Sequence, residues 1–194
     1  MIRAKCLTVY AGDAPVVKCA YFEVEPGELA VLFGPTGGGK SSIVKAMAGI
    51  YKWTGSLEVP RSYFIFQDVD ANLLFAYTDE ELASVTCKGF VERRPIAELS
   101  MGQRQLLAVR LALESDAEAV VFDEPLAFLD PASALEVAQA IAKLADSGRA
   151  VLVAEHRLEF FLNAHKFYLV NRAVVPADLE ALLLEGARGG FGPY

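Results

Sequence analysis

A glycine-rich segment that ends in Lys-Ser constrains the fold of this chain more than any other feature. It completes the pattern G-x-x-x-x-G-K-[ST], and its residues are Gly34, Pro35, Thr36, Gly37, Gly38, Gly39, Lys40 and Ser41. An apolar run, Leu29–Phe33, precedes the segment, and a run with helical character, Ser41–Ile50, follows it. Strand, glycine loop and helix in this order are typical of a phosphate-binding loop. The sequence therefore predicts a nucleoside triphosphate site.

The residue types of this loop suit the chemistry of a bound triphosphate. Glycines permit a backbone curl whose N–H groups face phosphate oxygens, and the dipole of the following helix adds positive charge. We expect Lys40 to bridge the β- and γ-phosphates, Ser41 to offer its hydroxyl to Mg²⁺, and Ser42 to reach the α-phosphate. A plain glycine-rich turn would explain neither the lysine nor the flanking pattern.

Composition and charge exclude some classes of protein. With 194 residues, 54% of them hydrophobic, the chain can bury a large core. Its net charge of −7 argues against a nucleic-acid partner, because such a partner needs concentrated Lys and Arg. The sequence has no signal-peptide pattern and no run of 18 apolar residues, so we expect no membrane span.

Three cysteines, Cys6, Cys19 and Cys87, are scattered along the chain. Their spacing matches neither a metal site nor a disulfide framework. The sequence therefore predicts reduced thiols that pack inside a cytoplasmic protein.

The order of apolar runs and turn residues predicts an α/β fold. Strands are expected at residues 2–10, 16–25, 28–33, 55–59, 62–66, 119–122, 150–154 and 167–170. Helices are expected at residues 41–50, 79–85, 100–113, 131–144 and 158–163. The first three strands predict an antiparallel meander that leads into the glycine loop. The later alternation of strand and helix indicates a mostly parallel sheet.

Two adjacent carboxylates, Asp123 and Glu124, end the apolar run Ala119–Phe122. The end of a buried parallel strand faces the ligand crevice, so Asp123 is placed to hold Mg²⁺ through its water shell. Glu124 is placed to polarise the attacking water as general base, a role worth roughly 10²–10⁴ in rate. A strand-ending turn would explain Asp-Glu-Pro alone, but the pairing with the glycine loop favours catalysis.

The pattern Ser-x-x-Gln formed by Ser100 and Gln103 has two interpretations that can both hold. It is a capping box that opens the helix expected at 100–113. The Ser100 hydroxyl and the Gly102 N–H at a helix N-terminus also suit a γ-phosphate.

Taken together, these motifs resemble the ABC-family ATPases over nearly the whole chain. The resemblance rests on the glycine loop and on Leu99–Gln103, Asp123–Pro125, Leu129–Asp130 and Glu155–His156. It implies one domain, 1–194, with a P-loop NTPase core and an N-terminal antiparallel β portion. It also implies a helical insertion at about 68–113 that is shorter than is usual in the family.

The resemblance also implies roles for single residues. Gln67 would touch Mg²⁺ and sense a membrane partner, Asp130 would lie at a dimer seam, and His156 would contact the γ-phosphate. Tyr10 would stack on adenine, and Ser100, Gly102 and Gln103 would contact the ATP held by a second subunit. A solvated histidine and a packed strand-end tyrosine remain the plainer interpretations of His156 and Tyr10.

The resemblance implies that the chain would be the ATP-binding and ATP-hydrolysing subunit of an ABC transporter. It would lie in the cytoplasm at the inner face of the membrane and pair head to tail with a copy or related chain to power a permease. The strings Phe66–Asp70 and Ala154–Glu159 look most like the ATPases of energy-coupling-factor importers of vitamins or Ni/Co ions. A soluble ABC ATPase without a transporter, disfavoured by the acidic charge, and a slow nucleotide-gated assembly module are the alternatives.

Two positions depart from the family pattern. Met101 takes the place of the first glycine in the usual signature Leu-Ser-Gly-Gly-Gln, and Phe128 takes that of a small residue. A third feature is the apolar run Leu73–Tyr77, which falls in a region expected to be exposed. An exposed apolar patch predicts a docking surface for a membrane subunit, whereas packing of the helical insertion is the alternative.

Overall fold

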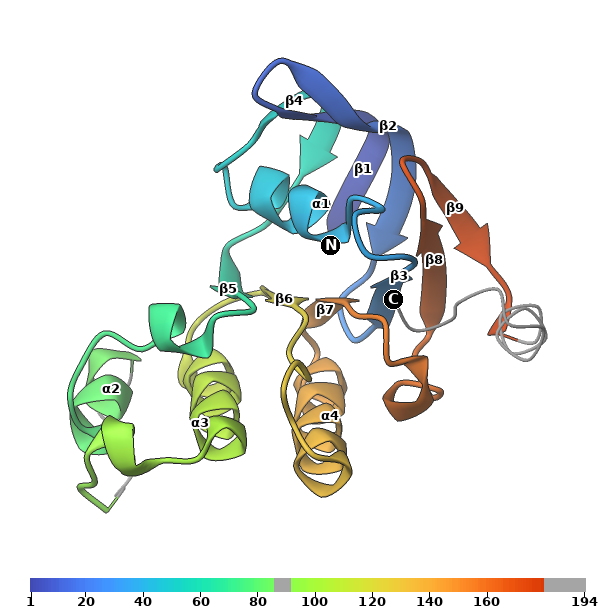
Figure 1. The fold of residues 1–194 in the computed structure, drawn as a ribbon. Helices are drawn as coiled ribbons and strands as arrows, with labels where there is room; N and C mark the ends of the chain where they lie inside the picture. Colours follow the sequence, from blue (N-terminus) through green and yellow to red (C-terminus); the bar gives the residue numbers. More distant parts are fainter. Residues whose placement is uncertain (86–91, 180–194) are drawn as a thin grey trace.

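The computed structural model describes residues 1–85 and 92–179, which form two sheets with helices between and below them (Figure 1). A small antiparallel sheet has the order β2-β1-β4, and a large sheet has the order β5-β6-β7-β3-β8-β9. The large sheet is parallel except for its edge pair β8 and β9. The strands are β1 (Ile2–Ala11), β2 (Ala14–Val24), β3 (Leu29–Phe33), β4 (Lys52–Glu58), β5 (Ser62–Ile65), β6 (Ala119–Asp123), β7 (Ala150–Ala154), β8 (Lys166–Val170) and β9 (Val174–Ala177).

The helices divide between the two faces of the large sheet. The first helix contacts strands of both sheets and lies between them, whereas α3 and α4 lie below the large sheet (Figure 1). The helices are α1 (Lys40–Met47), α2 (Thr78–Val85), α3 (Met101–Glu114) and α4 (Pro131–Asp146), and the short 3₁₀ turns are η1 (Val69–Asn72), η2 (Ile96–Glu98) and η3 (Leu158–Phe160). None of the helices in the described ranges has the length and apolar character needed to cross a bilayer.

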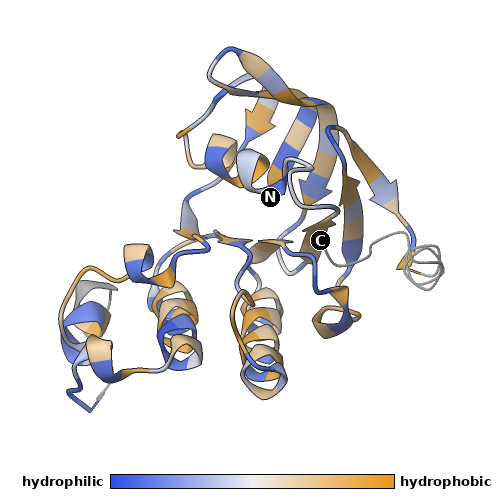
Figure 2. Cartoon of the chain, in the orientation of Figure 1, coloured by the Kyte–Doolittle hydropathy of each residue, from blue (hydrophilic) through white to orange (hydrophobic). Residues whose placement is uncertain are grey.

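Alternate residues of the central strands pack in two separate hydrophobic cores, one on each face of the large sheet. In β3, Val31 and Phe33 pack in the core under α3 and α4, whereas Ala30 and Leu32 pack in the core around α1. All five residues of β3, β6 and β7 are buried, as expected of strands covered on both faces. Helices α3 and α4 carry both hydrophobic and hydrophilic residues, which suits helices that cover one face of a sheet (Figure 2).

The α/β fold with a mostly parallel sheet is confirmed, but two expectations about single elements are wrong and one strand was missed. Strand β3 does not continue an antiparallel meander, because it pairs in parallel with β7 and β8, and β4 is the third antiparallel strand. The helix expected at 158–163 is only the turn η3, and the edge strand β9 was not expected. The unbroken apolar character of β3 fits a central parallel strand better than a half-exposed antiparallel one.

The segment between β5 and β6 holds η1, α2, η2 and α3 and has a small core of its own. The buried residues of this core are Leu82, Ile96, Leu99, Leu107 and Leu111. The residues between α2 and η2 include 86–91, which lie outside the described ranges, as does Cys87.

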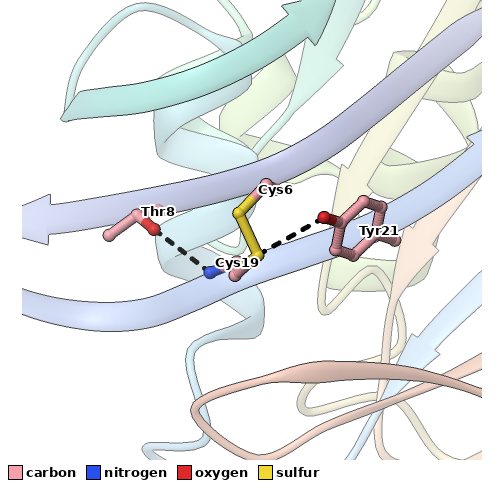
Figure 3. Close-up of a disulfide and its surroundings, with 4 residues drawn as sticks. All are labelled: Cys6, Thr8, Cys19 and Tyr21. Carbon is pink, nitrogen blue, oxygen red and sulfur yellow. Dashed lines mark hydrogen bonds between the residues drawn. A yellow bond between two sulfur atoms is a disulfide. The ribbon is translucent and has the colours of Figure 1, made fainter.

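Cys6 and Cys19 form a disulfide that joins β1 to β2 (Figure 3). Both cysteines are exposed and have positive φ angles, 48° and 47°, and the β1–β2 register shifts around them. The Cys19 N–H donates to the Thr8 hydroxyl at 3.1 Å. The expectation of reduced, packed thiols is therefore wrong for this pair. Spacing alone did not reveal it, because the hairpin brings residues 13 positions apart onto neighbouring strands.

Candidate functional site

The glycine loop connects β3 to α1 and is fixed by its neighbours. A side chain at Gly34, whose φ is 145°, would place its Cβ 2.1 Å from the Val170 carbonyl oxygen. One at Gly39, whose φ is 108°, would place its Cβ 2.4 Å from a Val17 methyl group. Gly38 is also buried, whereas Pro35, Thr36 and Gly37, at the tip of the loop, are exposed. The backbone thus enters a space between β2 and β8 that only glycine fits.

Lys40, the first residue of α1, points back over this loop. Its ammonium group donates to the carbonyl oxygens of Gly34 at 2.8 Å and Pro35 at 3.2 Å, and only 4% of the residue is exposed. Burial lowers the pKa of Lys40, and three nearby carboxylates oppose this effect, those of Glu124, Glu155 and Asp123. The site therefore holds a lysine among negative groups, close to where phosphates would bind.

Ser41 and Asp123 meet across the gap between α1 and the end of β6. The Ser41 hydroxyl donates to Asp123 Oδ1 at 2.8 Å. Burial raises the pKa of Asp123, and the bond from Ser41 partly offsets the increase. Ser42 follows in the first turn of α1 and is partly buried.

A hollow of about 370 Å³ opens beside this pair, and oxygen groups suited to Mg²⁺ line it. Its lining residues are Ser41, Lys45, Ile50, Phe66, Gln67, Asp68 and Asp123. The described residues contain no cluster of three or more His, Cys, Asp or Glu side chains that could enclose a metal. This fits Mg²⁺, which protein sites often bind through one or two carboxylates together with water and substrate phosphates.

Glu124 follows Asp123 and turns out of the strand with a positive φ of 49°. Its N–H donates to the Ala154 carbonyl oxygen at 2.8 Å, which anchors it to the end of β7. Its carboxylate accepts a bond of 3.3 Å from the Gln67 side-chain amide. The expected general base and the expected metal-sensing glutamine therefore lie together beside the hollow.

Ser100 and Gln103 form both bonds of the predicted capping box at the start of α3. The Gln103 N–H donates to the Ser100 hydroxyl, and the Ser100 N–H donates to the Gln103 side chain. A Cβ at Gly102 would lie 3.1 Å from Ser133 Cβ, so this glycine also permits the close approach of α3 and α4. Met101, beside it, is exposed.

Asp130 caps the N-terminus of α4, and Phe128 lies two residues before it. The Asp130 carboxylate accepts bonds from the N–H groups of Ala132 and Ser133 and from the Ser133 hydroxyl. These bonds, led by that of the hydroxyl, lower the pKa of Asp130. Phe128 is 85% exposed and has a positive φ of 62°, so the loop turns this ring outward.

The remaining two predicted residues lie at other parts of the site. His156 is exposed at the end of β7, with its Nδ1 atom 2.9 Å from Glu155. Tyr10 lines a second hollow of about 580 Å³, together with Tyr51 and Trp53. Ile50 lines both hollows, so the two hollows are neighbours. Tyr10, the residue expected to stack on adenine, therefore lies in the hollow next to the one that Ser41 and Asp123 line.

The structure thus gathers Lys40, Ser41, Gln67, Asp123 and Glu124 into one cluster. Two residues with several bonds near this cluster had no predicted role, the buried Glu155 and the neighbouring Arg157. The sequence did contain a sign of the role of Glu155. This carboxylate directly follows five apolar strand residues, so it could have been expected to be buried and to need hydrogen-bond partners.

Comparison with known proteins finds similarity to ATP-binding proteins of ABC transporters. The family model described as ABC transporter matches residues 17–62. A putative ABC transporter ATP-binding protein of Streptomyces coelicolor is 31% identical, over 95% of this chain and 40% of its own length. The energy-coupling factor transporter ATP-binding protein EcfA1 of Thermotoga maritima is 27% identical, over 78% of this chain and 70% of its own. The chain therefore spans only about 40% of the first of these relatives.

Solved structures agree with the fold. CbiO1 of Clostridium perfringens, described as part of the ABC transporter complex CbiONQ, superposes with a TM-score of 0.82 at 18% identity, over 95% of this chain and 91% of that one. The ATP-binding cassette MJ0796, a dimer bound to ADP and Pi after hydrolysis, gives a TM-score of 0.75 at 19% identity, over 92% and 99%.

Proposed function

Because this chain belongs to the ABC ATPase family, we propose that it binds MgATP and hydrolyses it in a two-subunit cassette that drives a membrane permease. The observation that carries the proposal is one cluster of polar side chains. Ser41, Gln67 and Asp123 line a common hollow, Glu124 bonds to Gln67, and Lys40 lies near the carboxylates of Asp123 and Glu124. A lysine, a hydroxyl and two carboxylates at the ends of adjacent elements suit phosphoryl transfer to water.

Each member of the cluster has a distinct part in this reaction. The Lys40 ammonium exchanges its bonds to loop carbonyls for bonds to β- and γ-phosphate oxygens. Ser41 and Asp123 would hold Mg²⁺, and the ion would supply positive charge that neutralises the phosphates. Glu124 accepts a proton from the attacking water, and Gln67 orients the Glu124 carboxylate through the bond between them.

The second half of the ATP site comes from another subunit in this proposal. Ser100 and Gln103 are exposed at the first turn of α3, where a helix N-terminus can receive a γ-phosphate. The dimeric cassette MJ0796 supports this arrangement, since it shares the fold. We propose a head-to-tail pair, formed by two copies or by this chain and a related one.

Replacement of Glu124 by glutamine tests the hydrolytic role. Glu124→Gln keeps the ground-state contacts to ATP, so its nucleotide affinity stays near wild type while turnover falls roughly 10²- to 10⁴-fold. It also accumulates an ATP-bound dimer on size-exclusion chromatography. Glu118→Gln, an exposed carboxylate at the other end of β6, is the matched control and hydrolyses normally. Hydrolysis by Glu124→Gln at the wild-type rate contradicts the assignment.

The membrane partner is proposed to be the permease of an energy-coupling-factor importer. The likeness to EcfA1 and CbiO1 supports this choice. Within the apolar run 73–77, Leu74 is 84% and Phe75 46% exposed, whereas Leu73 packs on the core of the helical segment. The guanidinium carbon of Arg93 lies 3.8 Å from the centre of the Tyr77 ring and stacks on it. The two ends of the run, Leu73 and Tyr77, therefore contact other residues of this chain. Only the exposed residues Leu74 and Phe75 between them are a candidate docking surface.

Charge at the exposed part of this run tests the docking surface. Leu74→Asp and Phe75→Asp keep thermal stability and basal ATPase activity but lose co-purification with the proposed membrane permease when the two are co-expressed. Val175→Asp, on the exposed edge of β9, is the control and retains co-purification. Unfolding of both variants supports packing instead, and undiminished co-purification moves the docking surface elsewhere.

A further inference from the structure

Glu155 carries a fully buried carboxylate that the proposed reaction does not use. It directly follows β7, its side chain is 0% exposed, and its N–H donates to the Leu32 carbonyl oxygen at 2.9 Å. Taking a carboxylate out of water is costly unless hydrogen-bond donors replace the water. The partners of this carboxylate therefore indicate what it does.

Four N–H groups converge on the Glu155 carboxylate. Oε1 accepts from the backbone N–H of His156 at 2.7 Å and of Arg157 at 3.2 Å. The His156 ring contributes Nδ1 at 2.9 Å from the same oxygen. Oε2 accepts from the backbone N–H of Leu126 at 3.2 Å. One side chain thus joins the histidine after β7 to the loop after β6.

Arg157, on the other side of His156, holds the same loop. Its Nη1 atom donates to the carbonyl oxygens of Leu126 at 3.2 Å and Leu129 at 3.1 Å. Its guanidinium also lies 4.5 Å from the centre of the Phe160 ring, which fixes the side chain further. The two neighbours of His156 therefore hold the segment 126–129, which runs from Glu124 toward Asp130.

The bond to Glu155 sets which ring nitrogen of His156 carries the proton. An ionised carboxylate can only accept, so Nδ1 must be the N–H donor, and Nε2 is the nitrogen that remains for a ligand. The other histidine of the chain shows the opposite arrangement, because His165 Nδ1 accepts the Leu29 N–H at 3.0 Å. When neutral, His165 must carry its proton on Nε2.

We propose that Glu155 is a positioning residue that holds His156 in the Nδ1–H form and, with Arg157, ties this ring to the loop between Glu124 and Asp130. The catalytic consequence rests on the proposed ATPase function. With Nδ1 held, Nε2 has one fixed orientation and, once protonated, can donate to a phosphate oxygen with Glu155 as the buried counter-charge. Displacement of a phosphate-binding histidine by about 1 Å can cost 10²-fold in rate.

The protonation pattern of the two histidines is the first test, and it needs no nucleotide. Histidine labelled with ¹⁵N is incorporated into the full chain, and two-bond ¹H–¹⁵N spectra are recorded over a pH series, from which the spectra of the neutral rings are used. The expected result is Nδ1–H for His156 and Nε2–H for His165, assigned with His165→Gln. A His156 ring in the Nε2–H form, or in a mixture of both forms, overturns the proposal.

Variants of Glu155 separate positioning from simple structural support. Glu155→Met has similar volume without acceptors, so His156 loses its Nδ1–H preference. Glu159→Gln, an exposed carboxylate in the next turn, is the control and keeps this preference. If Glu155→Met fails to give a cooperative thermal transition, Glu155→Gln is used, since its single acceptor oxygen cannot serve four N–H groups.

Steady-state kinetics complete the test. Glu155→Gln lowers kcat by at least about tenfold and leaves the KM for MgATP within about threefold, because Lys40 keeps Asp123 and Glu124 as neighbouring carboxylates. Unchanged kcat in an active protein overturns the positioning role while leaving the ATPase function intact. A wild-type protein that does not hydrolyse ATP refutes the proposed function instead, and the histidine spectra still decide whether Glu155 holds His156.

Discussion

The two halves of the proposed ATP site differ in how their polar groups are satisfied. On the phosphate-loop half, Lys40 is almost fully buried, and Ser41 and Asp123 bond to each other at 2.8 Å. On the signature half, Ser100 and Gln103 are exposed and bond to each other at the end of a helix. The first half is enclosed within this chain, whereas the second presents its groups outward. Such a division is expected if each half meets its counterpart on another subunit.

The enclosed half also carries an electrostatic cost that the outward half does not. Burial lowers the pKa of Lys40 and raises that of Asp123, so the surroundings disfavour the charged form of both groups. A bound MgATP supplies the opposite charges that both groups need. On the signature half, Asp130 has its pKa lowered by hydrogen bonds, so its surroundings favour its charge.

Removal of the lysine gives the largest expected effect on the enclosed half. Lys40→Ala leaves the phosphates without their main positive partner, and nucleotide affinity falls by about 2–4 kcal/mol, or roughly 30- to 1,000-fold. Calorimetric titration with MgATP measures this loss, and Lys143→Ala on the exposed side of α4 is the control. Equal affinity in the two variants contradicts the phosphate role of the loop.

The outward half is tested at Phe128. This ring is 85% exposed, so Phe128→Ala leaves the melting temperature unchanged. If the ring packs against a second subunit, association falls by about 1–2 kcal/mol. The dimer fraction with ATP, measured in the Glu124→Gln background, reports this loss, and the exposed Leu162→Ala serves as control. A lower melting temperature with unchanged association would place Phe128 in the fold rather than at a seam.

A smaller effect is expected when the buried charge of Asp123 is removed. In the unfolded chain the Asp123 carboxyl has its ordinary pKa of 3.8, and in the folded protein its pKa is higher. The folded protein therefore binds this proton more tightly than the unfolded chain does. Its stabilising contribution is thus full below that value and is lost as the pH rises through the folded pKa. Asp123→Asn consequently raises the melting temperature at neutral pH by about 2–4 °C without nucleotide. Calorimetry with and without MgATP checks this, and a lower melting temperature contradicts the burial cost.

The enclosed half was predictable from the sequence because its motifs are local. The glycine loop, the strand before it and the carboxylates of Asp123 and Glu124 each follow from neighbouring residues, and so does the capping box at Ser100. The roles assigned to these residues remain predictions. The unbroken apolar run of Leu29–Phe33 could also have placed β3 at the centre of the large sheet, had its burial on both faces been weighed.

Features that depend on contacts between distant residues were not predictable in this way. The Cys6–Cys19 disulfide requires the β1–β2 register, and the bonds of Glu155 require the ends of β6 and β7 to lie side by side. Gly102 was predicted from its signature position alone, but its place against Ser133 depends on how α3 and α4 pack. Sequence patterns report the elements, whereas these contacts arise only when the elements assemble.

Complementation between two inactive variants tests most directly whether the two halves belong to one composite site. Lys40→Ala disables the phosphate-loop half, and Ser100→Arg places a bulky cation at the signature half. If the halves act in trans, mixed dimers contain one intact site, and the mixture hydrolyses ATP faster than the sum of the separate variants. Differently tagged subunits show by affinity capture that mixed dimers form. Mixed dimers whose activity never exceeds that sum would contradict the head-to-tail arrangement.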